Sequence, residues 1–364
     1  MTSFEEKFPS QNWELLKELA KNAKSQLSGN QKTEIVDSIS PMPFEMLRDN
    51  PRFDELKKIG EEILRKNGAA AFMVAGGQGS RLGFEGPKGA FKLKLPNGEK
   101  SIFQIHAERL LELKNKYGKN IPFAIMTSPL NHQETIEHFE ANFYFGLNKE
   151  TVRFFEQGTM CALKPNGEPI FENPEKLALV PDGNGGCFRA LSKSKTLAWF
   201  KELGIKFVFL YGVDNVLAKP CDPAFLGAFA DSGKAAASKV VKKKSPEEKM
   251  GVFALKNGLP TVIEYTELPQ NRIKEFDGGN IVAHLFTIES LEKLENEPLP
   301  WHLAVKKICG VEGAFKFEQF LFDAFPKLGS MFLAGVEREK EFAPVKNASG
   351  EDSPQTAVDL LTST

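Results

Sequence analysis

The chain alternates between short apolar runs and stretches in which apolar residues recur every three or four positions. Runs such as 69–75 and 207–213 contain almost no polar residue, which is typical of strands buried on both faces. The two patterns predict strands at 69–75, 122–127, 152–155 and 207–213 and helices at 102–117, 131–143 and 188–203. Because strands and helices alternate at this spacing, we expect an α/β fold with a Rossmann-like, mostly parallel sheet and helices on both faces.

The pattern changes on either side of this region. Two helical stripes, at 10–27 and 51–66, precede the first strand and predict an N-terminal helical arm. Beyond residue 222 the chain predicts further strands at 235–241, 252–255, 261–265, 281–288 and 331–336, with a hairpin turn at 256–260 and a Phe-rich segment at 315–325. We therefore divide the chain into an arm (1–66), a central domain (67–300) and a short C-terminal segment (301–364) that completes the site.

Composition limits the classes of partner. The 364 residues are 41% hydrophobic and 26% charged, with a formal net charge of −1. A nearly neutral chain gives no electrostatic reason to expect nucleic acid or an anionic membrane as a partner, and no apolar run reaches the roughly 18 residues of a membrane span. None of the four cysteines forms a C-x-x-C pair, so we expect reduced thiols in the cytoplasm rather than disulfides or zinc.

A glycine-rich stretch directly follows the first predicted strand. Gly76, Gly77 and Gly79 lie close together, followed by Arg81 and, seven residues later, Lys88. Because glycine lacks a Cβ, its backbone N–H groups can approach phosphate oxygens closely. Two cations beside such a loop predict a polyphosphate site.

Two better-known phosphate motifs do not fit this stretch. The dinucleotide fingerprint G-x-G-x-x-G requires a glycine where this chain has Leu82, and the sequence contains no G-x-x-x-x-G-K-[ST] run. A glycine-rich turn without ligand chemistry is the remaining alternative, and the spacing of the two cations argues against it.

Two later positions also carry candidate chemistry. Residues 179–186, L-V-P-D-G-N-G-G, combine glycines with Asn184, whose amide both donates and accepts hydrogen bonds. Asp214 follows the strand 207–213, at the carboxyl end where ligands of parallel sheets bind, and its carboxylate suits a hard cation such as Mg²⁺. The alternatives are a simple turn residue for Asn184 and a helix cap for Asp214.

Taken together, these motifs resemble the UTP-dependent sugar-1-phosphate uridylyltransferases, and among them the UDP-N-acetylglucosamine pyrophosphorylase branch. The resemblance covers about residues 69–359 and rests on A-G-G-x-G-S-R-L-G with P-K-G, then P-D-G-N-G-G, V-D-N, E-Y, G-N and V-K-N in the family's order. It implies a nucleotidyltransferase type A fold with 67–300 as the catalytic domain. The family's N-A-G-N stands here as D-G-G-N at 277–280, which leaves the preferred sugar open.

The resemblance also implies roles for individual residues. The nucleotide is expected to contact Ala75, Gly76, Gly77, Gly79, Gln157, Pro181, Asp182 and Gly183, with Gln157 reading the uracil edge. The sugar is expected at Asn184, Glu264, Gly279, Asn280, Phe317 and Phe320, the metal at Asp214, and catalysis at Arg81, Lys88 and Lys346. The phenylalanines also suit a core stripe, and a single lysine such as Lys346 also suits the surface.

The implied reaction converts UTP and a sugar 1-phosphate to a UDP-sugar and pyrophosphate. N-acetylglucosamine 1-phosphate is the favoured substrate, and glucose 1-phosphate is the alternative. The sugar phosphate attacks the α-phosphorus in line without a protein nucleophile, while Mg²⁺ and the cations offset the charge. The family's C-terminal β-rich extension is mostly lacking here, so we carry over no oligomer and expect a monomer.

Two other functions are compatible with parts of the pattern. A nicotinamide-dependent oxidoreductase would use a similar sheet, but Leu82 in place of the third glycine argues against it. A non-catalytic sugar-nucleotide-binding protein would need no metal carboxylate, so Asp214 argues for turnover.

Overall fold

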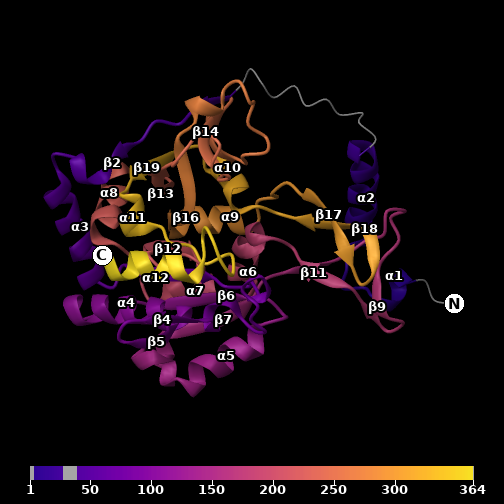
Figure 1. The fold of residues 1–364 in the computed structure, drawn as a ribbon, viewed down its shortest axis with the longest axis horizontal. Coiled ribbons are helices and arrows are strands. Elements are labelled where there is room, and N and C mark those ends of the chain that lie inside the picture. Colours follow the sequence, from indigo (N-terminus) through magenta and orange to yellow (C-terminus); the bar gives the residue numbers. More distant parts are fainter. Residues whose placement is uncertain (1–3, 28–38, 364) are drawn as a thin grey trace. The chain divides into compact units, whose positions relative to one another are not determined.

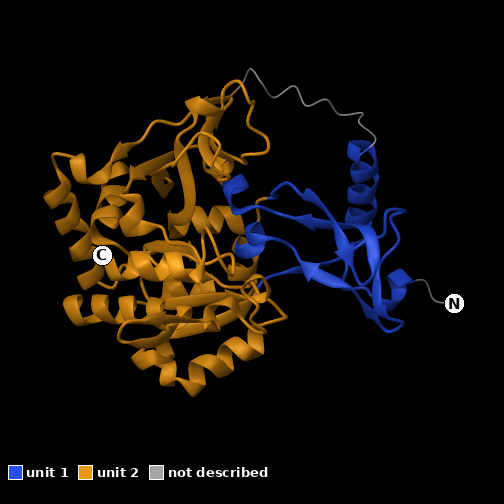
Figure 2. Ribbon diagram, in the orientation of Figure 1, with its two compact units in different colours: residues 1–37, 157–187, 298–324 blue, residues 38–156, 188–297, 325–364 orange. Residues whose placement is uncertain are grey.

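The computed structural model describes residues 4–27 and 39–363 (Figure 1). These residues belong to two compact units, each assembled from separate parts of the chain (Figure 2). Unit 1 comprises 1–37, 157–187 and 298–324, and unit 2 comprises 38–156, 188–297 and 325–364. The domain boundaries predicted from the sequence, at residues 66 and 300, divide the chain into consecutive segments. That division stays a prediction.

An eleven-stranded sheet forms the centre of unit 2 in the described part of the chain. Its strands are β1 (Ile39–Pro41), β2 (Glu45–Met46), β3 (Ala69–Val74), β6 (Phe123–Thr127), β7 (Val152–Glu156), β12 (Phe207–Gly212), β13 (Ala236–Lys242), β14 (Val252–Lys256), β15 (Leu259–Ile263), β16 (Gly278–Thr287) and β19 (Met331–Gly335). The order is β2-β19-β13-β16-β12-β3-β6-β7, with β14 beside β16 and with β1 and β15 beside β14.

The pairing directions agree with the predicted sheet. β12, β3, β6 and β7 are parallel to one another, as are β13, β19 and β2. β16 runs antiparallel to both β12 and β13. The prediction of a mostly parallel sheet in an α/β fold is therefore confirmed.

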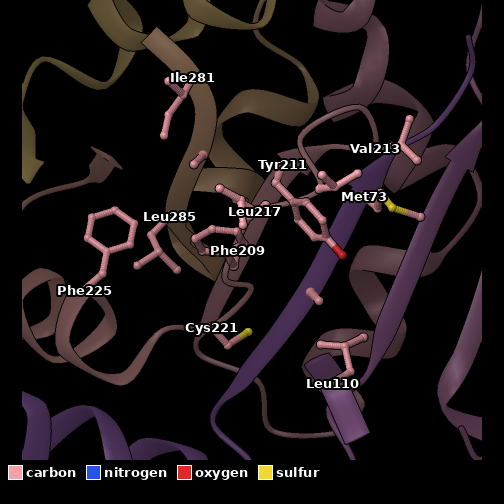
Figure 3. Packing of buried hydrophobic residues seen from close by; sticks show 14 of the residues in the cluster. Met73, Leu110, Phe209, Tyr211, Val213, Leu217, Cys221, Phe225, Ile281 and Leu285 are labelled. Carbon is pink, nitrogen blue, oxygen red and sulfur yellow. The ribbon is translucent and has the colours of Figure 1, made fainter. Parts of the chain in front are cut away.

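Helices cover both faces of this sheet. One face carries α3 (Phe53–Arg65), α4 (Ile102–Tyr117), α5 (His132–Ala141) and α8 (Pro223–Ser232), whose apolar side chains join the main core cluster. Figure 3 shows part of this cluster, with Leu110 of α4, Phe225 of α8 and Tyr211 of β12. The other face carries α6 (Cys187–Lys193), α7 (Thr196–Glu202), α9 (Ile288–Glu295) and α10 (Ala324–Leu328).

Shorter elements complete unit 2. A hairpin of β4 (Lys92–Leu95) and β5 (Gly98–Ser101) precedes α4, and the last helices are α11 (Arg338–Glu341) and α12 (Pro354–Ser363). Single 3-10 turns are η1 (Leu47–Asp49), η2 (Ser80–Leu82), η3 (Lys88–Ala90), η4 (Phe143–Gly146), η5 (Lys149–Thr151) and η7 (Ile273–Glu275).

The described residues of unit 1 form three antiparallel strand pairs and two N-terminal helices. The pairs are β8 (Thr159–Cys161) with β11 (Leu179–Pro181), β9 (Phe171–Asn173) with β10 (Lys176–Leu177), and β17 (His302–Ile308) with β18 (Val311–Glu318). The helices are α1 (Phe4–Lys7) and α2 (Trp13–Leu27), with the turns η6 (Asn184–Gly186) and η8 (Leu321–Asp323). The predicted apolar stripe of α2 packs on Leu163 and Phe315 of the strand region.

The predicted helix at 188–203 is wrong as a single element, because it is divided into α6 and α7. Lys195 adopts a left-handed backbone with φ of +61°. Beside it the Ser194 hydroxyl donates to the Leu191 carbonyl and lies 2.8 Å from the Thr196 hydroxyl. Hydroxyl groups that bond locally in this way compete with the helical backbone pattern and favour a break.

Several other expectations can be compared with the described residues. The hairpin at 256–260 is confirmed, since Asn257 and Gly258 both have positive φ between β14 and β15, as an Asn-Gly turn requires. The four cysteines are free thiols. Across the described ranges, no helix combines the length and the apolar character needed to cross a membrane.

Candidate active site

The glycine-rich stretch forms a closed loop at the end of β3. Gly79 donates its N–H to the Gly86 carbonyl at 2.9 Å, and Lys88 donates its N–H to the Gly77 carbonyl at 3.0 Å. A Cβ placed on Gly77 would lie 4.0 Å from Cε of Lys88, so the lysine side chain runs along this glycine. Arg81 lies in η2 and is exposed, with no hydrogen bond or ion pair to any described residue.

Asn131, which the sequence reasoning missed, holds this loop in place. Its side chain is buried, and its Nδ2 donates to the carbonyls of Ala75 (2.9 Å) and Gly77 (3.2 Å). Its Oδ1 accepts from the N–H of Ser128 at 2.8 Å. The available signal was a polar residue between a buried strand and a helix, a position that ordinarily indicates only an N-cap.

Asp214 lies just after β12, at the edge of the sheet where the glycine-rich loop begins after β3. β12 and β3 are adjacent and parallel, Gly212 is paired with Val74, and the Val213 N–H donates to the Val74 carbonyl at 3.1 Å. The Asp214 side chain is half-buried and forms no hydrogen bond with the described residues. The next helix is capped by Asp222, whose carboxylate accepts from the Ala224 N–H, so the helix-cap alternative for Asp214 does not apply.

A returning segment of the chain brings Lys346 close to Asp214. The Val345 N–H donates to the Asp214 carbonyl at 2.9 Å, and the Asn215 amide bonds the backbone of Glu341 and Ala343 at 2.8 and 2.9 Å. Lys346 follows directly on this segment. Its ammonium lies 3.2 Å from the Asp352 carboxylate.

Glu264 and Asn280 lie on either side of the start of β14. The Asn280 N–H donates to the Gly251 carbonyl at 2.9 Å, and a Cβ on Gly251 would lie 3.3 Å from a carboxylate oxygen of Glu264. Next to Asn280 the strand β16 is irregular, and Val282 has a φ of +51°, which is unusual for a β-branched residue. The Asn280 side chain accepts from the Val282 N–H at 2.9 Å, so it stabilises this bulge.

In unit 1, the P-D-G-N-G-G loop is built around a buried carboxylate. Asp182 is 5% exposed, and a Cβ on Gly158 or Gly186 would lie 2.2 or 2.4 Å from its oxygens, so both positions require glycine. Gly183 has a φ of +90°, and the Asn184 side chain accepts from the Leu321 N–H at 2.9 Å. Asn184 is therefore more than a simple turn residue, because it joins two segments of unit 1.

The remaining predicted residues of unit 1 differ in their surroundings. Gln157 is buried, and Pro181 is the last residue of β11. Phe317 is 2% exposed and belongs to the core cluster of unit 1, the alternative weighed for it from the sequence. Phe320 is half-buried and contacts His302 in a tilted arrangement, with 4.4 Å between ring centroids.

The residues present suit a metal ion that is bound together with phosphates. Among the described residues, no group of three or more His, Cys, Asp or Glu side chains has a metal-binding arrangement. Mg²⁺ commonly keeps several waters and is held by one or two carboxylates plus substrate phosphates. A single carboxylate such as Asp214, with no competing partner, fits that mode and not a metal held by protein alone.

Comparisons with known proteins identify a family that matches most of the chain. The family model described as UTP–glucose-1-phosphate uridylyltransferase matches residues 16–361. UDP-N-acetylglucosamine diphosphorylase 2 of Arabidopsis thaliana is 40% identical over 357 residues, covering 88% of this chain and 71% of the relative. UDP-N-acetylglucosamine pyrophosphorylase of Saccharomyces cerevisiae is 38% identical, covering 88% and 74%.

A solved structure is similar over most of the chain. The uridine diphosphate N-acetylglucosamine pyrophosphorylase from Trypanosoma brucei, in complex with an inhibitor, has a TM-score of 0.83 and 30% sequence identity. The match covers 94% of this chain and 75% of that chain.

Proposed function

Because the chain belongs to the UTP–glucose-1-phosphate uridylyltransferase family, we propose that it converts UTP and N-acetylglucosamine 1-phosphate to UDP-N-acetylglucosamine and pyrophosphate. The observation that carries this proposal is the placement of the Lys88 loop and of Asp214 at the same edge of two neighbouring parallel strands. The choice of N-acetylglucosamine is supported by the relatives, which are named for that sugar nucleotide.

The chemistry asks the protein to bring two polyanions together. Arg81 and Lys88 would bind the phosphates that leave as pyrophosphate, and Lys346 would bind the phosphate of the incoming sugar. Asp214 would hold Mg²⁺, whose charge offsets that of the phosphate oxygens. The sugar phosphate oxygen then forms a bond to the α-phosphorus as the bond to pyrophosphate breaks, and fixed cations stabilise the charge in the transition state.

Binding of the organic parts is proposed from the resemblance together with local geometry. Gln157 would read the uracil edge, and the backbone of 75–79 and 181–183 would approach the nucleotide. Glu264, Gly279 and Asn280 would bind sugar hydroxyls or the acetamido group. Asn184 and Phe320 would also contact the sugar. Phe317 would act only through its neighbours, since its ring is buried in a core. We also propose that the protein is a monomer and lies in the cytoplasm.

A substrate panel tests the proposal. Purified protein with Mg²⁺ is given each of several sugar 1-phosphates with each of the four common nucleoside triphosphates, and pyrophosphate release is measured. We expect UTP with N-acetylglucosamine 1-phosphate to be the fastest pair, with loss of turnover in Asp214→Asn. Preference for glucose 1-phosphate would favour the alternative sugar. Binding of UDP-sugar without turnover of any pair would favour a non-catalytic binding protein.

A further inference from the structure

One side of helix α4 contacts both of the segments that carry the proposed phosphate chemistry in unit 2. Phe103 lies against Gly89, the residue after Lys88, so closely that a Cβ on this glycine would be 2.3 Å from the ring. Three residues on, Nε2 of His106 lies 2.9 Å from the carbonyl oxygen of Val213, the residue before Asp214. Residues three apart are neighbours on a helix surface, so one helix face reaches both segments.

The same face continues to the next turn. Arg109 donates from its guanidinium to the carbonyl of Ala218, at the other end of the loop that begins with Asp214. The 213–218 loop is therefore bonded to α4 near both of its ends. Figure 3 shows Val213 and Leu217 of this loop with Tyr211 of β12 in the buried region.

The hydrogen bond from His106 has a defined direction. The ring is fully buried, and burial lowers its pKa to about 4, so it carries one proton at neutral pH. A carbonyl oxygen can only accept, so Nε2 must hold that proton and donate it. Nδ1 then has a bare lone pair, and it has no partner among the described residues.

Packing alone does not account for a histidine at this position. The ring makes a single polar contact and leaves a second polar atom buried without one, whereas an aliphatic side chain would fill similar space without that cost. Its one hydrogen bond is to the carbonyl of Val213, the residue directly before Asp214. The other anchors of this backbone come from β3, through Val213 N–H to Val74, and from Val345 N–H to the Asp214 carbonyl.

We propose that His106 is a positioning residue for the reaction: its Nε2–H fixes the Val213 carbonyl and so sets the direction of the Asp214 carboxylate relative to the segment that carries Lys88. The role rests on the proposed function of Asp214. His106 touches no substrate. Its hydrogen bond attaches the Asp214 segment to helix α4, which also packs against Gly89. The geometry of the two segments is linked in this way.

Two substitutions and a matched control test this role. His106→Leu removes the donor, and His106→Gln keeps an amide N–H at a similar distance from the backbone. We expect His106→Leu to lower kcat by about tenfold to a hundredfold, the scale of a small misplacement of reacting groups, and to raise the Mg²⁺ concentration for half-maximal rate. KM for both substrates should change by less than about threefold, and His106→Gln should recover most of the kcat. His284→Leu is the control, since His284 is equally buried but bonds Ser238.

Two readouts do not depend on turnover. Hydrogen exchange of the amides at 214–218 should be faster in His106→Leu than in the wild type and in His106→Gln. Binding of Mn²⁺ in the presence of UTP, followed by electron paramagnetic resonance, should weaken in the same order. The inference is overturned if His106→Leu matches the wild type in kcat and exchange, or if His106→Gln is no better than His106→Leu. If the wild type itself gives no pyrophosphate and binds no Mn²⁺ with UTP, the proposed function fails. If hydrogen exchange is also unchanged in His106→Leu, the role of the His106 hydrogen bond in holding this backbone fails as well.

Discussion

The two lysines proposed to bind phosphate differ in what they contact before any substrate is present. Lys88 is half-buried beside Gly77 and has no ion pair with the described residues. Lys346 lies 3.2 Å from Asp352 and above the ring of Phe342. An unpaired ammonium adds its full charge to an arriving polyanion, whereas a paired one must first exchange its partner.

We expect Lys88→Ala to lower kcat by about two orders of magnitude, the scale of losing one preorganised charge in a transition state. Steady-state kinetics of pyrophosphate release would measure the loss. Lys94→Ala, at an exposed lysine of the neighbouring strand β4, serves as the control. A Lys88→Ala variant with a near-wild-type rate would remove Lys88 from the mechanism.

Asp352 is the ion-pair partner of Lys346 in the structure, and removal of its charge should strengthen binding of the sugar 1-phosphate. An exposed ion pair contributes up to about 1 kcal/mol, so Asp352→Asn should lower KM for the sugar 1-phosphate by about two- to fivefold with kcat within twofold. The matched control is Glu351→Gln, which removes the same charge from the next residue, a partner of Lys244. Equal effects of the two variants would indicate a general charge effect and not competition for Lys346.

His284 gives the molecule a pH-dependent contribution to stability. Burial lowers its pKa to about 3, from an ordinary value near 6.5. Between these values the unfolded chain binds a proton that the folded protein excludes, so the free energy of unfolding should fall as pH decreases below 6.5. From pH 7 to 5.5 the loss should be about 1 kcal/mol from this residue. Urea unfolding at both pH values should show a smaller change in His284→Leu, and an identical change would contradict the assignment.

The sequence identifies candidate site residues where a motif carries them and misses residues that only a single polar side chain would indicate. Lys88 and Asp214 were identified because their spacing and their position after strands are distinctive. Asn131 and His106 were not, since an asparagine before a helix and a histidine on an apolar helix face each have ordinary explanations. Their importance depends on which backbone carbonyls the fold brings within 3 Å.

At the scale of elements, the contact between α3 and α8 depends on two glycines. A Cβ on Gly60 would lie 1.9 Å from the Pro223 carbonyl oxygen, and one on Gly227 would lie 1.7 Å from the Leu56 carbonyl oxygen. The backbones of the two helices therefore touch directly. Neither glycine was identified from the sequence, because α8 itself was not among the predicted helices.

Gly60→Ala should therefore destabilise the protein even though alanine favours helices. The methyl group meets backbone atoms that cannot turn aside, so the helices must separate, at a cost of about 1–3 kcal/mol or more. Lys58→Ala, on the exposed side of α3, should change stability by less than about 0.5 kcal/mol. Thermal and urea unfolding would compare the two, and a Gly60→Ala variant as stable as the wild type would show that the helices have room to move.

Strands β3, β12 and β19 of unit 2 are predictable because each is an almost entirely apolar run. The strands of unit 1 are shorter and mix polar with apolar residues, as β9 and β17 do. Such segments are stabilised by long-range pairing that no local pattern encodes. The same limit applies to the break at Lys195, which an otherwise helical stripe concealed.

At the scale of the whole molecule, each unit is assembled from segments far apart in the chain. Helix α2 packs against strands that lie more than a hundred residues later, and together they form the core of unit 1. The local sequence pattern relates only neighbours in the chain, so it predicts α2 and α3 in one arm. In the structure α2 belongs to unit 1 and α3 to unit 2.

Trp13→Ala should therefore weaken unit 1 selectively. The indole is buried in the cluster of α2 with Leu163 and Phe315, and truncation of such a side chain costs about 3–5 kcal/mol. Hydrogen exchange should show lost protection in residues 159–181 and 302–318, with little change in β3 and β12. Glu18→Ala, on the exposed side of α2, is the control. Uniform loss of protection in both units would contradict independent cores.

The antiparallel course of β16 has a consequence for how the site can vary. Because this strand runs opposite to β12 and β13, Gly279 and Asn280, near its start, lie where its neighbours end. The chain thus returns to the proposed reaction edge without a crossover helix, by way of the 264–277 segment. On the proposed assignment of Gly279 and Asn280 to the sugar, changes of length and sequence in that segment would alter sugar choice and leave the loops after β3 and β12 unchanged.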